Sequence, residues 1–176
     1  MSTSNRTEKK LVILGDSSVG KSSILLRYTQ NEFSEEFEVT IGGAFLQVEA
    51  ELEDGSKMTL DVWDTAGQER YKSLMHLYYR QASAALIVFD LSNHDSFERC
   101  EYWIDRLKSQ EPDCMLFLVG NKADLPNWQV DEQMAQELAE KHECDFFKTS
   151  AKLGDNVKVL FTNVAEAIRN KNKAAK

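Results

Sequence analysis

The sequence predicts an α/β fold, built on a six-stranded and mostly parallel sheet with one antiparallel edge strand and helices on both faces. Two observations predict it. From residue 84 to residue 168, short apolar runs alternate with segments of helical period, and strands separated by helices pair in parallel. Before them, the turn Glu53-Asp-Gly55 separates two extended runs, which predicts a single antiparallel hairpin.

Each expected element follows from its own local pattern. The expected strands, which are short and apolar or alternating, span residues 9–14, 44–52, 57–64, 84–90, 115–120 and 145–149. The expected helices, in which apolar residues recur at helical spacing, span residues 21–30, 95–109, 131–142 and 157–168. Residues 31–43 have no sustained period and should form a loop, long enough to suggest a function.

Length and composition narrow the organisation of the chain. At 176 residues the chain suits one domain, with residues 1–8 a flexible N-terminus, residues 9–170 the domain and residues 171–176 the start of a basic C-terminal tail. A net charge of -8 argues against a protein that grips nucleic acid along a basic face. No segment is apolar for long enough to span a bilayer. We therefore expect a cytoplasmic chain that is a monomer and binds no nucleic acid.

The three cysteines, Cys100, Cys114 and Cys144, have neither C-x-x-C spacing nor a neighbouring histidine cluster. This pattern indicates neither a disulfide framework nor a zinc site. It fits a reducing compartment, and we expect all three side chains to be small buried apolar groups.

A phosphate-binding loop is predicted between the first strand and the first helix. Gly15-Asp-Ser-Ser-Val-Gly-Lys-Ser22 matches the pattern G-x-x-x-x-G-K-[ST], whose glycines let backbone N–H groups wrap a phosphate chain. Lys21 would meet the β and γ phosphates, the hydroxyl of Ser22 would bind Mg²⁺, and the N-terminus of the helix favours the same anion. The pattern predicts a three-layer P-loop NTPase fold. An ordinary glycine-bearing turn is the alternative.

A second motif, Asp64-Thr-Ala-Gly67-Gln68-Glu69, follows a strand, so that its aspartate emerges where ligands bind in open α/β sheets. Asp64 can hold Mg²⁺ directly or through water, the N–H of Gly67 can approach a γ-phosphate, and Gln68 is placed to orient an attacking water. A turn capped by Asp64 is the alternative.

A third motif predicts recognition of guanine. In Asn121-Lys-Ala-Asp124, the aspartate could accept hydrogen bonds from N1–H and the exocyclic amine of guanine, a pair of donors that adenine does not offer. By itself the tetrapeptide also fits an Asx-type turn. Together with Ser150-Ala-Lys152, which follows the last strand, it predicts a base pocket at the ends of two neighbouring strands.

With these motifs in this order, the chain resembles the small Ras-like GTPases over nearly its whole length. The resemblance implies that residues 9–170 are a GTPase domain whose cofactors are GTP or GDP and Mg²⁺. It implies that Ser22 and Thr40 ligate Mg²⁺, that Asp64 binds it through water, and that Gln68 is the catalytic residue. The implied nucleotide-binding residues are Ser17, Ser18, Val19, Gly20, Lys21, Ser22, Ser23, Phe33, Thr40, Gly67, Asn121, Lys122, Asp124, Ser150, Ala151 and Lys152. Among these Phe33 would stack on the base edge, with a role as a buried anchor as its alternative.

Within that superfamily the chain is most similar to the Rab group, and to endosomal Rabs, through Ile41-Gly-Gly-Ala-Phe45, the run from Trp63 to Tyr71, and Tyr78-Tyr-Arg-Gln-Ala82. The resemblance implies that Phe45, Trp63 and Tyr78 form the aromatic patch that meets effectors. Ordinary packing in the hairpin and helix is the alternative. The sequence departs from the pattern at Gln81, where glycine is usual, and at Gly43, where a side chain is common. Ser17 and Ser18 stand where Ras itself has glycines, and could tune the hydrolysis rate.

The implied function is a GTP-operated switch in vesicle and endosomal membrane traffic. The implied partners are an exchange factor, a GTPase-activating protein, effectors and a prenyl-binding dissociation inhibitor. Because residues 33–40 contain no arginine, hydrolysis should be slow until an activating protein supplies one. We expect the protein to cycle from the cytoplasm to the cytosolic face of endosomal or other vesicle membranes, through lipidated C-terminal cysteines absent from this chain.

Three alternatives remain open at this stage. A kinase built on the same loop should carry an arginine-rich lid and a second substrate site, and the sequence shows neither. A scaffold that binds GTP but hydrolyses little of it is the second alternative, and single-turnover measurements of GTP hydrolysis would distinguish it from a switch. The third alternative is a Ras-like signalling GTPase of another branch.

Overall fold

The computed structural model describes residues 9–34, 44–65, 73 and 75–174. Within them, six strands form one sheet in the order β2-β3-β1-β4-β5-β6. The strands are β1 (Lys10–Gly15), β2 (Ala44–Glu51), β3 (Lys57–Asp64), β4 (Ala84–Asp90), β5 (Met115–Asn121) and β6 (Asp145–Lys148). All neighbouring pairs are parallel except β2 with β3, so that β2 is the antiparallel edge strand. The predicted sheet is confirmed.

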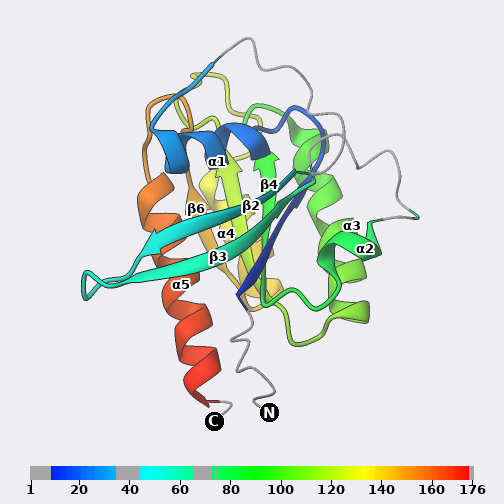
Figure 1. Cartoon of the computed structure of the whole chain (residues 1–176). Helices are drawn as coiled ribbons and strands as arrows, with labels where there is room; N and C mark the ends of the chain where they lie inside the picture. The colour runs from blue at the N-terminus through cyan, green and yellow to red at the C-terminus, as the bar shows by residue number, and fades with distance from the viewer. Residues whose placement is uncertain (1–8, 35–43, 66–72, 74, 175–176) are drawn as a thin grey trace, which may run out of the picture.

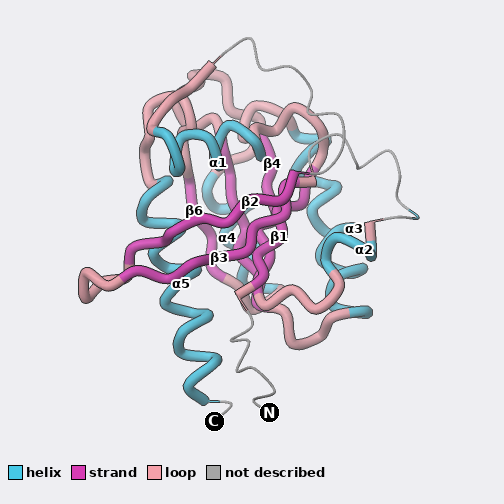
Figure 2. Tube along the Cα trace, viewed as in Figure 1, coloured by secondary structure: helices cyan, strands magenta, loops and turns pink. Residues whose placement is uncertain are grey.

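Helices cover both faces of the sheet, as predicted (Figure 1). The helices of the described residues are α1 (Lys21–Gln30), α2 (His76–Tyr79), α3 (His94–Gln110), α4 (Glu132–Lys141) and α5 (Val157–Ala174). Helices α1 and α5 pack on one face, and α2, α3 and α4 pack on the other. The result is a three-layer α/β fold, in which helix, sheet and helix follow one another (Figure 2).

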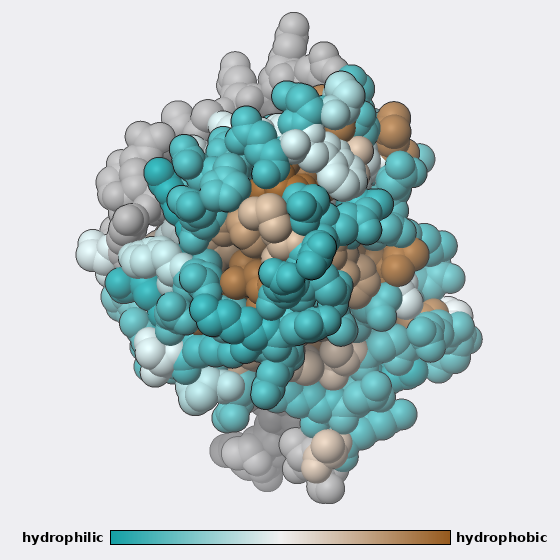
Figure 3. Space-filling model, turned by 180° about the vertical axis from the view of Figure 1, so that it is seen from behind, coloured by the Kyte–Doolittle hydropathy of each residue, from teal (hydrophilic) through white to brown (hydrophobic). Residues whose placement is uncertain are grey.

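Two apolar cores form because side chains of a strand point alternately to opposite faces of the sheet. In β1, Leu11 and Ile13 join the core under α1 and α5, whereas Val12 and Leu14 join the core under α3. Every residue of the central strand β4 is buried, as expected for a strand that is covered on both faces. Figure 3 shows that the face of the molecule seen from behind is mostly hydrophilic, with a small apolar area near its middle.

The helix N-termini differ in a way that bears on function. The side chain of Asn93 accepts a hydrogen bond from the N–H of Ser96 at the start of α3, and Asp131 accepts one from Met134 at the start of α4. At the start of α1 the capping residue is Gly20, which has no side chain, and no side chain of the described residues caps this end. The first turn of α1 therefore offers backbone N–H groups to a ligand.

The β2–β3 hairpin is fastened to α5. Thr162 donates its hydroxyl to the carbonyl oxygen of Glu51 at 2.9 Å, and the N–H of Glu53 donates to a carboxylate oxygen of Glu166 at 2.9 Å. Arg169 pairs with Asp54 at 3.0 Å. These contacts hold the hairpin turn, which projects from the sheet in Figure 1, against the last helix.

Some elements differ from their predicted bounds. Helix α2 was not predicted, because four residues are too few to show a helical period. Helix α5 continues to Ala174, so the expected domain limit at residue 170 falls inside a helix. Cys100 is buried as expected, but Cys114 and Cys144 are only partly buried, and all three are free thiols. No helix among the described residues is long and apolar enough to cross a membrane.

Candidate functional site

The predicted motifs meet at one edge of the sheet, where the carboxyl ends of the parallel strands lie together. Four strands end there in residues of interest, namely Gly15 on β1, Asp64 on β3, Asp90 on β4 and Asn121 on β5. Ser150 follows two residues after β6. In Figure 1 this edge is the end of the molecule at which α1 lies.

The loop between β1 and α1 depends on two glycines. Gly15 has a φ of 148°, and a Cβ added there would lie 2.2 Å from the carbonyl oxygen of Val88. Gly20 has a φ of 98°, and a Cβ there would lie 2.2 Å from the side-chain amide nitrogen of Asn121. The loop therefore follows a path that only glycine permits at these positions. Between them, Ser18 also adopts a left-handed conformation, with a φ of 68°.

Lys21 places a buried positive charge under this loop. Its side chain is only 3% exposed, and its ammonium group donates to the carbonyl oxygens of Gly15 at 2.7 Å and Asp16 at 2.6 Å. The carboxylate of Asp16 pairs with Arg99 of α3 at 3.3 Å. A buried ammonium and the N-terminus of α1 both favour an anion at this loop.

Ser22 and Asp64 bring two oxygen ligands together. The hydroxyl of Ser22, in the first turn of α1, donates to a carboxylate oxygen of Asp64, the last residue of β3. The next residue, Thr65, is fully buried and donates its hydroxyl to the carbonyl oxygen of Ile13 at 2.5 Å, which fixes the end of β3 against β1. Hydroxyl and carboxylate oxygens are the hard ligands that Mg²⁺ takes, so this donor pair fits that ion.

Asn121 fastens the phosphate loop to the segment after β6. It is 1% exposed, and its amide group donates to the carbonyl oxygen of Val19 at 3.0 Å. Its side-chain oxygen accepts hydrogen bonds from the hydroxyl of Thr149 at 3.1 Å and from the N–H of Ala151 at 3.2 Å. Through the contacts named here, Asn121 acts as a structural clasp between two parts of the site.

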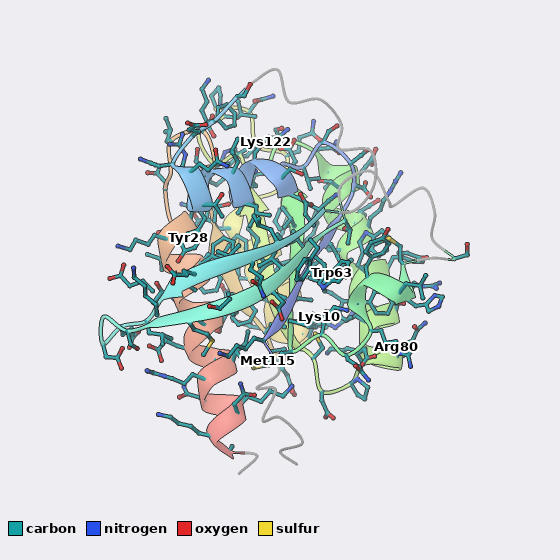
Figure 4. All side chains as sticks on the ribbon, in the orientation of Figure 1. Lys10, Tyr28, Trp63, Arg80, Met115 and Lys122 are labelled. Carbon is teal, nitrogen blue, oxygen red and sulfur yellow. The ribbon has the colours of Figure 1, made fainter. Side chains whose placement is uncertain are left out.

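Lys122 and Asp124 are the two charged residues of the same motif, and each has its own hydrogen-bond partners. Lys122 lies near the N-terminus of α1 (Figure 4), donates to the carbonyl oxygen of Ser18 at 2.8 Å and pairs with Asp90 at 3.1 Å. Asp124 accepts a hydrogen bond from the hydroxyl of Ser150 at 2.8 Å. A carboxylate has about four lone-pair sites, so one hydroxyl orients Asp124 and leaves room for donors of a ligand.

The described part of the structure includes some of the remaining predicted site residues and not others. Ser17 is exposed on the loop, Ser23 is partly buried in the first turn of α1, and Lys152 is exposed after β6. Phe33 is partly buried and packs against the core under α1 and α5, and its stacking on the base edge stays a prediction. Thr40, Gly43, Gly67 and Gln68 lie outside the described residues.

The three predicted patch aromatics form one cluster on β2, β3 and α2. The ring centroids of Phe45 and Trp63 are 4.9 Å apart, and those of Trp63 and Tyr78 are 6.2 Å apart. Phe45 is 49% exposed, and the neighbouring Leu46 and Leu77 are 41% and 56% exposed. The ammonium group of Lys10 lies 5.2 Å from the centre of the Trp63 ring, and both residues are labelled in Figure 4. We call Phe45, Trp63 and Tyr78 the aromatic patch.

Sequence reasoning missed residues that the site uses. Arg27 of α1 bonds to the carbonyl oxygens of Ala151 and Lys152, more than a hundred residues away, and no local pattern marks it. Asp90, the partner of Lys122, and Thr149, the partner of Asn121, could have been suspected from their positions at or just after a strand end. The departure at Gln81 also has a structural consequence, because its φ is 59°, a conformation that favours glycine.

Comparison with known proteins agrees with this geometry. The Ras family matches residues 10–170 of the chain. The chain is 45% identical over 163 residues to Ras-related protein Rab-5B of Plasmodium falciparum, an alignment that covers 92% of this chain and 78% of that protein. It is 43% identical over 163 residues to GTP-binding protein ypt5 of Schizosaccharomyces pombe, covering 91% of this chain and 77% of that protein. The chain therefore belongs to the Ras family, and its similarity to these two proteins confirms the likeness to endosomal Rabs that the sequence predicted.

Proposed function

We propose that this chain is a switch in endosomal vesicle traffic that binds GTP, hydrolyses it to GDP and phosphate, and binds effectors in the GTP state. The observation that carries the proposal is the meeting of the phosphate loop and the predicted guanine motifs at one sheet edge, where Asn121 bonds to both Val19 and Ala151. The similarity to Rab-5B and to GTP-binding protein ypt5 supports it. Residues 9–170 act in this proposal as one GTPase domain.

In this proposal the phosphates bind to residues 17–23, which comprise the end of the loop and the first turn of α1. Lys21 contacts the β and γ phosphates. The buried ammonium of Lys21 and the N-terminus of α1 both favour an anion there. Ser22 and Thr40 would hold Mg²⁺ directly, and Asp64 through water. When bound, Mg²⁺ neutralises charge that develops on the phosphates during transfer.

Guanine is selected in this proposal by Asp124, which the Ser150 hydroxyl orients. Asn121, Lys122, Ala151 and Lys152 complete the base pocket, and Phe33 closes the base edge. A pocket that needs two donors from the base rejects adenine, because the Asp124 carboxylate would then lack these partners.

Hydrolysis is assigned to Gln68 by its place in the sequence. Gln68 orients the attacking water, and the N–H of Gly67 contacts the γ-phosphate. Both residues are outside the described part of the chain, so this assignment rests on the motif alone. Since residues 33–40 contain no arginine, an activating protein would supply one in trans.

The aromatic patch is the proposed face for effectors, because the exposed ring of Phe45 contacts the partly buried ring of Trp63, which in turn lies beside Tyr78. An exchange factor, an activating protein and a prenyl-binding dissociation inhibitor complete the proposed set of partners. The proposed place of action is the cytosolic face of endosomal membranes, to which the Rab relatives point.

Two measurements test this function. Calorimetry should show tight binding of GDP and GTP in the presence of Mg²⁺ and at least a thousandfold weaker binding of ADP and ATP, and comparable affinity for ATP would refute guanine recognition. Single-turnover hydrolysis with an activating protein should release phosphate from the parent chain, and Gln68→Leu should slow this release at least a hundredfold. If the parent chain releases no phosphate under these conditions, the chain is a GTP-loaded scaffold.

A further inference from the structure

Arg27, in the last turns of α1, connects three segments through one guanidinium group. Its Nε donates to the carbonyl oxygen of Ala151 at 2.8 Å, and its Nη2 donates to the carbonyl oxygen of Lys152 at 2.6 Å. Its Nη1 donates to both the carbonyl and the side-chain oxygen of Asn31, each at 3.1 Å. Asn31 is the residue that ends α1, in a left-handed conformation with a φ of 56°.

This arrangement is specific to arginine. A guanidinium group is planar, stays protonated and presents its donors in a rigid fork, so two adjacent carbonyl oxygens can be held at once. The stem of the side chain is also packed, because a Cβ added at Gly154 would meet Cδ of Arg27 at 3.6 Å. A lysine at this position keeps the charge, but its three donors share one nitrogen, so it lacks the planar fork that reaches the carbonyl oxygens of Ala151 and Lys152 and the oxygens of Asn31 at the same time.

The two carbonyl oxygens belong to the segment Ser150–Lys152, which we call the base loop. Two further bonds of this loop lead directly to the proposed guanine pocket, since the N–H of Ala151 donates to Asn121 and the hydroxyl of Ser150 donates to Asp124. The backbone of Ser150 also bonds to Asp155 and Gly154, within the turn that follows the loop. Arg27 therefore holds the loop from the side of α1 while Asn121 and Asp124 hold it from the side of β5. A loop fixed from one side only would move relative to the base.

We propose that Arg27 is a positioning residue for guanine recognition, which sets how long the nucleotide stays bound by locking the base loop to the C-terminus of α1. This inference rests on the proposed function, since it concerns the same nucleotide site. Arg27 acts through the base loop and does not itself touch the nucleotide.

The phosphate side of the site should not depend on Arg27. Lys21 and Ser22 are in the first turn of α1, and the six residues from Lys21 to Arg27 correspond to about 9 Å along the helix axis. The hydrogen bonds of Arg27 described above all go to the base loop and to Asn31. Loss of Arg27 should therefore speed nucleotide release without changing the rate at which bound GTP is hydrolysed.

The test is the release of a fluorescent GDP analogue from the whole chain, in Mg²⁺ and with excess unlabelled GDP. We expect Arg27→Met to raise the release rate about tenfold, which corresponds to about 1.4 kcal/mol. Arg27→Lys should raise it at least fivefold, because one ammonium nitrogen does not restore the bonds to Ala151, Lys152 and Asn31 together. Intrinsic single-turnover hydrolysis of GTP should stay within twofold of the parent rate in both variants.

The matched control is Arg169→Met. Arg169 also bonds through two guanidinium nitrogens, but to Asp54 and Glu166 at the β2–β3 hairpin and α5, away from the base loop. Its loss should lower the thermal unfolding temperature and leave GDP release within twofold of the parent rate. This variant separates a positioning role from general destabilisation, and circular dichroism checks that each variant is folded.

Three outcomes would overturn the inference. These are release from Arg27→Met within twofold of the parent rate, release from Arg27→Lys equal to the parent rate, or an equal acceleration in Arg169→Met. If Arg27→Met does not fold, the comparison of Arg27→Lys with the parent decides. A parent chain that retains no GDP would instead contradict the proposed function, since Arg27 could then position no guanine site.

Discussion

The side-chain amide of Asn121 donates to the carbonyl oxygen of Val19 at 3.0 Å, across 102 residues of sequence. This bond joins the end of β5 to the loop between β1 and α1. Because the other end of the same side chain bonds to Thr149 and Ala151, one buried residue sets the spacing between the proposed phosphate and base subsites. A displacement of either subsite should therefore be transmitted to the other through Asn121.

The first prediction concerns this clasp. Asn121→Ala should lower the free energy of unfolding by about 2–4 kcal/mol, because it leaves three buried polar groups in two segments without this partner. Urea denaturation without added nucleotide measures the effect. Asn163→Ala is the control, since that exposed amide donates to Val159 within its own helix and should change stability by less than about 0.5 kcal/mol. Equal losses in the two variants would contradict the role of the clasp.

The second prediction compares two glycines with similar backbone conformations. Gly20→Ala should weaken GDP binding about a hundredfold, because the new Cβ would displace the Asn121 amide, from which it would lie only 2.2 Å away. Gly55 has a φ of 85°, but a Cβ added there would have no atom within 4 Å. Gly55→Ala should therefore lower the free energy of unfolding by about 1 kcal/mol, through backbone strain, and leave GDP affinity unchanged. Calorimetric titration of both variants checks the contrast. Full GDP affinity in Gly20→Ala would show that the loop can relax.

The third prediction concerns acid stability of the hairpin turn. Hydrogen bonds from the hydroxyl and N–H of Ser56, aided by Arg169, lower the pKa of Asp54 from 3.8 to about 2. A carboxyl whose pKa is lower in the folded state adds stability that is complete above pH 3.8 and disappears as the pH falls toward 2. The melting temperature of the parent should therefore exceed that of Asp54→Asn by a constant amount above about pH 5, and the difference should shrink toward pH 2. In a Ser56→Ala background, the difference in melting temperature between proteins with and without Asp54→Asn should be smaller. A difference between the parent and Asp54→Asn that does not change with pH would show that Asp54 does not cause the acid sensitivity.

The fourth prediction concerns the aromatic patch. Phe45→Ala should reduce capture of effectors by the GTP-loaded chain at least tenfold, because exposed aromatic side chains carry much of the affinity of such interfaces. The loss of its contact with Trp63 should cost only about 1 kcal/mol of stability. Affinity capture with GTP-loaded and GDP-loaded protein, followed by quantification of bound protein, measures the effect. Val159→Ala removes another half-exposed apolar side chain, on α5, and should capture effectors as the parent does.

The sheet, the four main helices and the chemistry of the motifs could be predicted from the amino-acid sequence. Hydrophobic period and turn residues are local properties, so the hairpin at Glu53-Asp-Gly55 and the clean stripe of α5 could be predicted from neighbouring residues alone. Gly15, Asp64 and Asn121 end three strands and Lys21 begins the helix after the first of them, and the parallel order of the strands was enough to expect these residues at one edge.

The contacts between groups at that edge could not be predicted without the three-dimensional structure. The fork of Arg27 onto the base loop, the bond from Asn121 to Val19 and the exposure of Phe45 all join segments that are distant in sequence. The four-residue helix α2 and the left-handed conformation of Gln81 were likewise absent from the local pattern. The physical reason is that burial and long-range hydrogen bonds depend on where the whole chain has packed, whereas a local pattern reports only the preferences of its own residues.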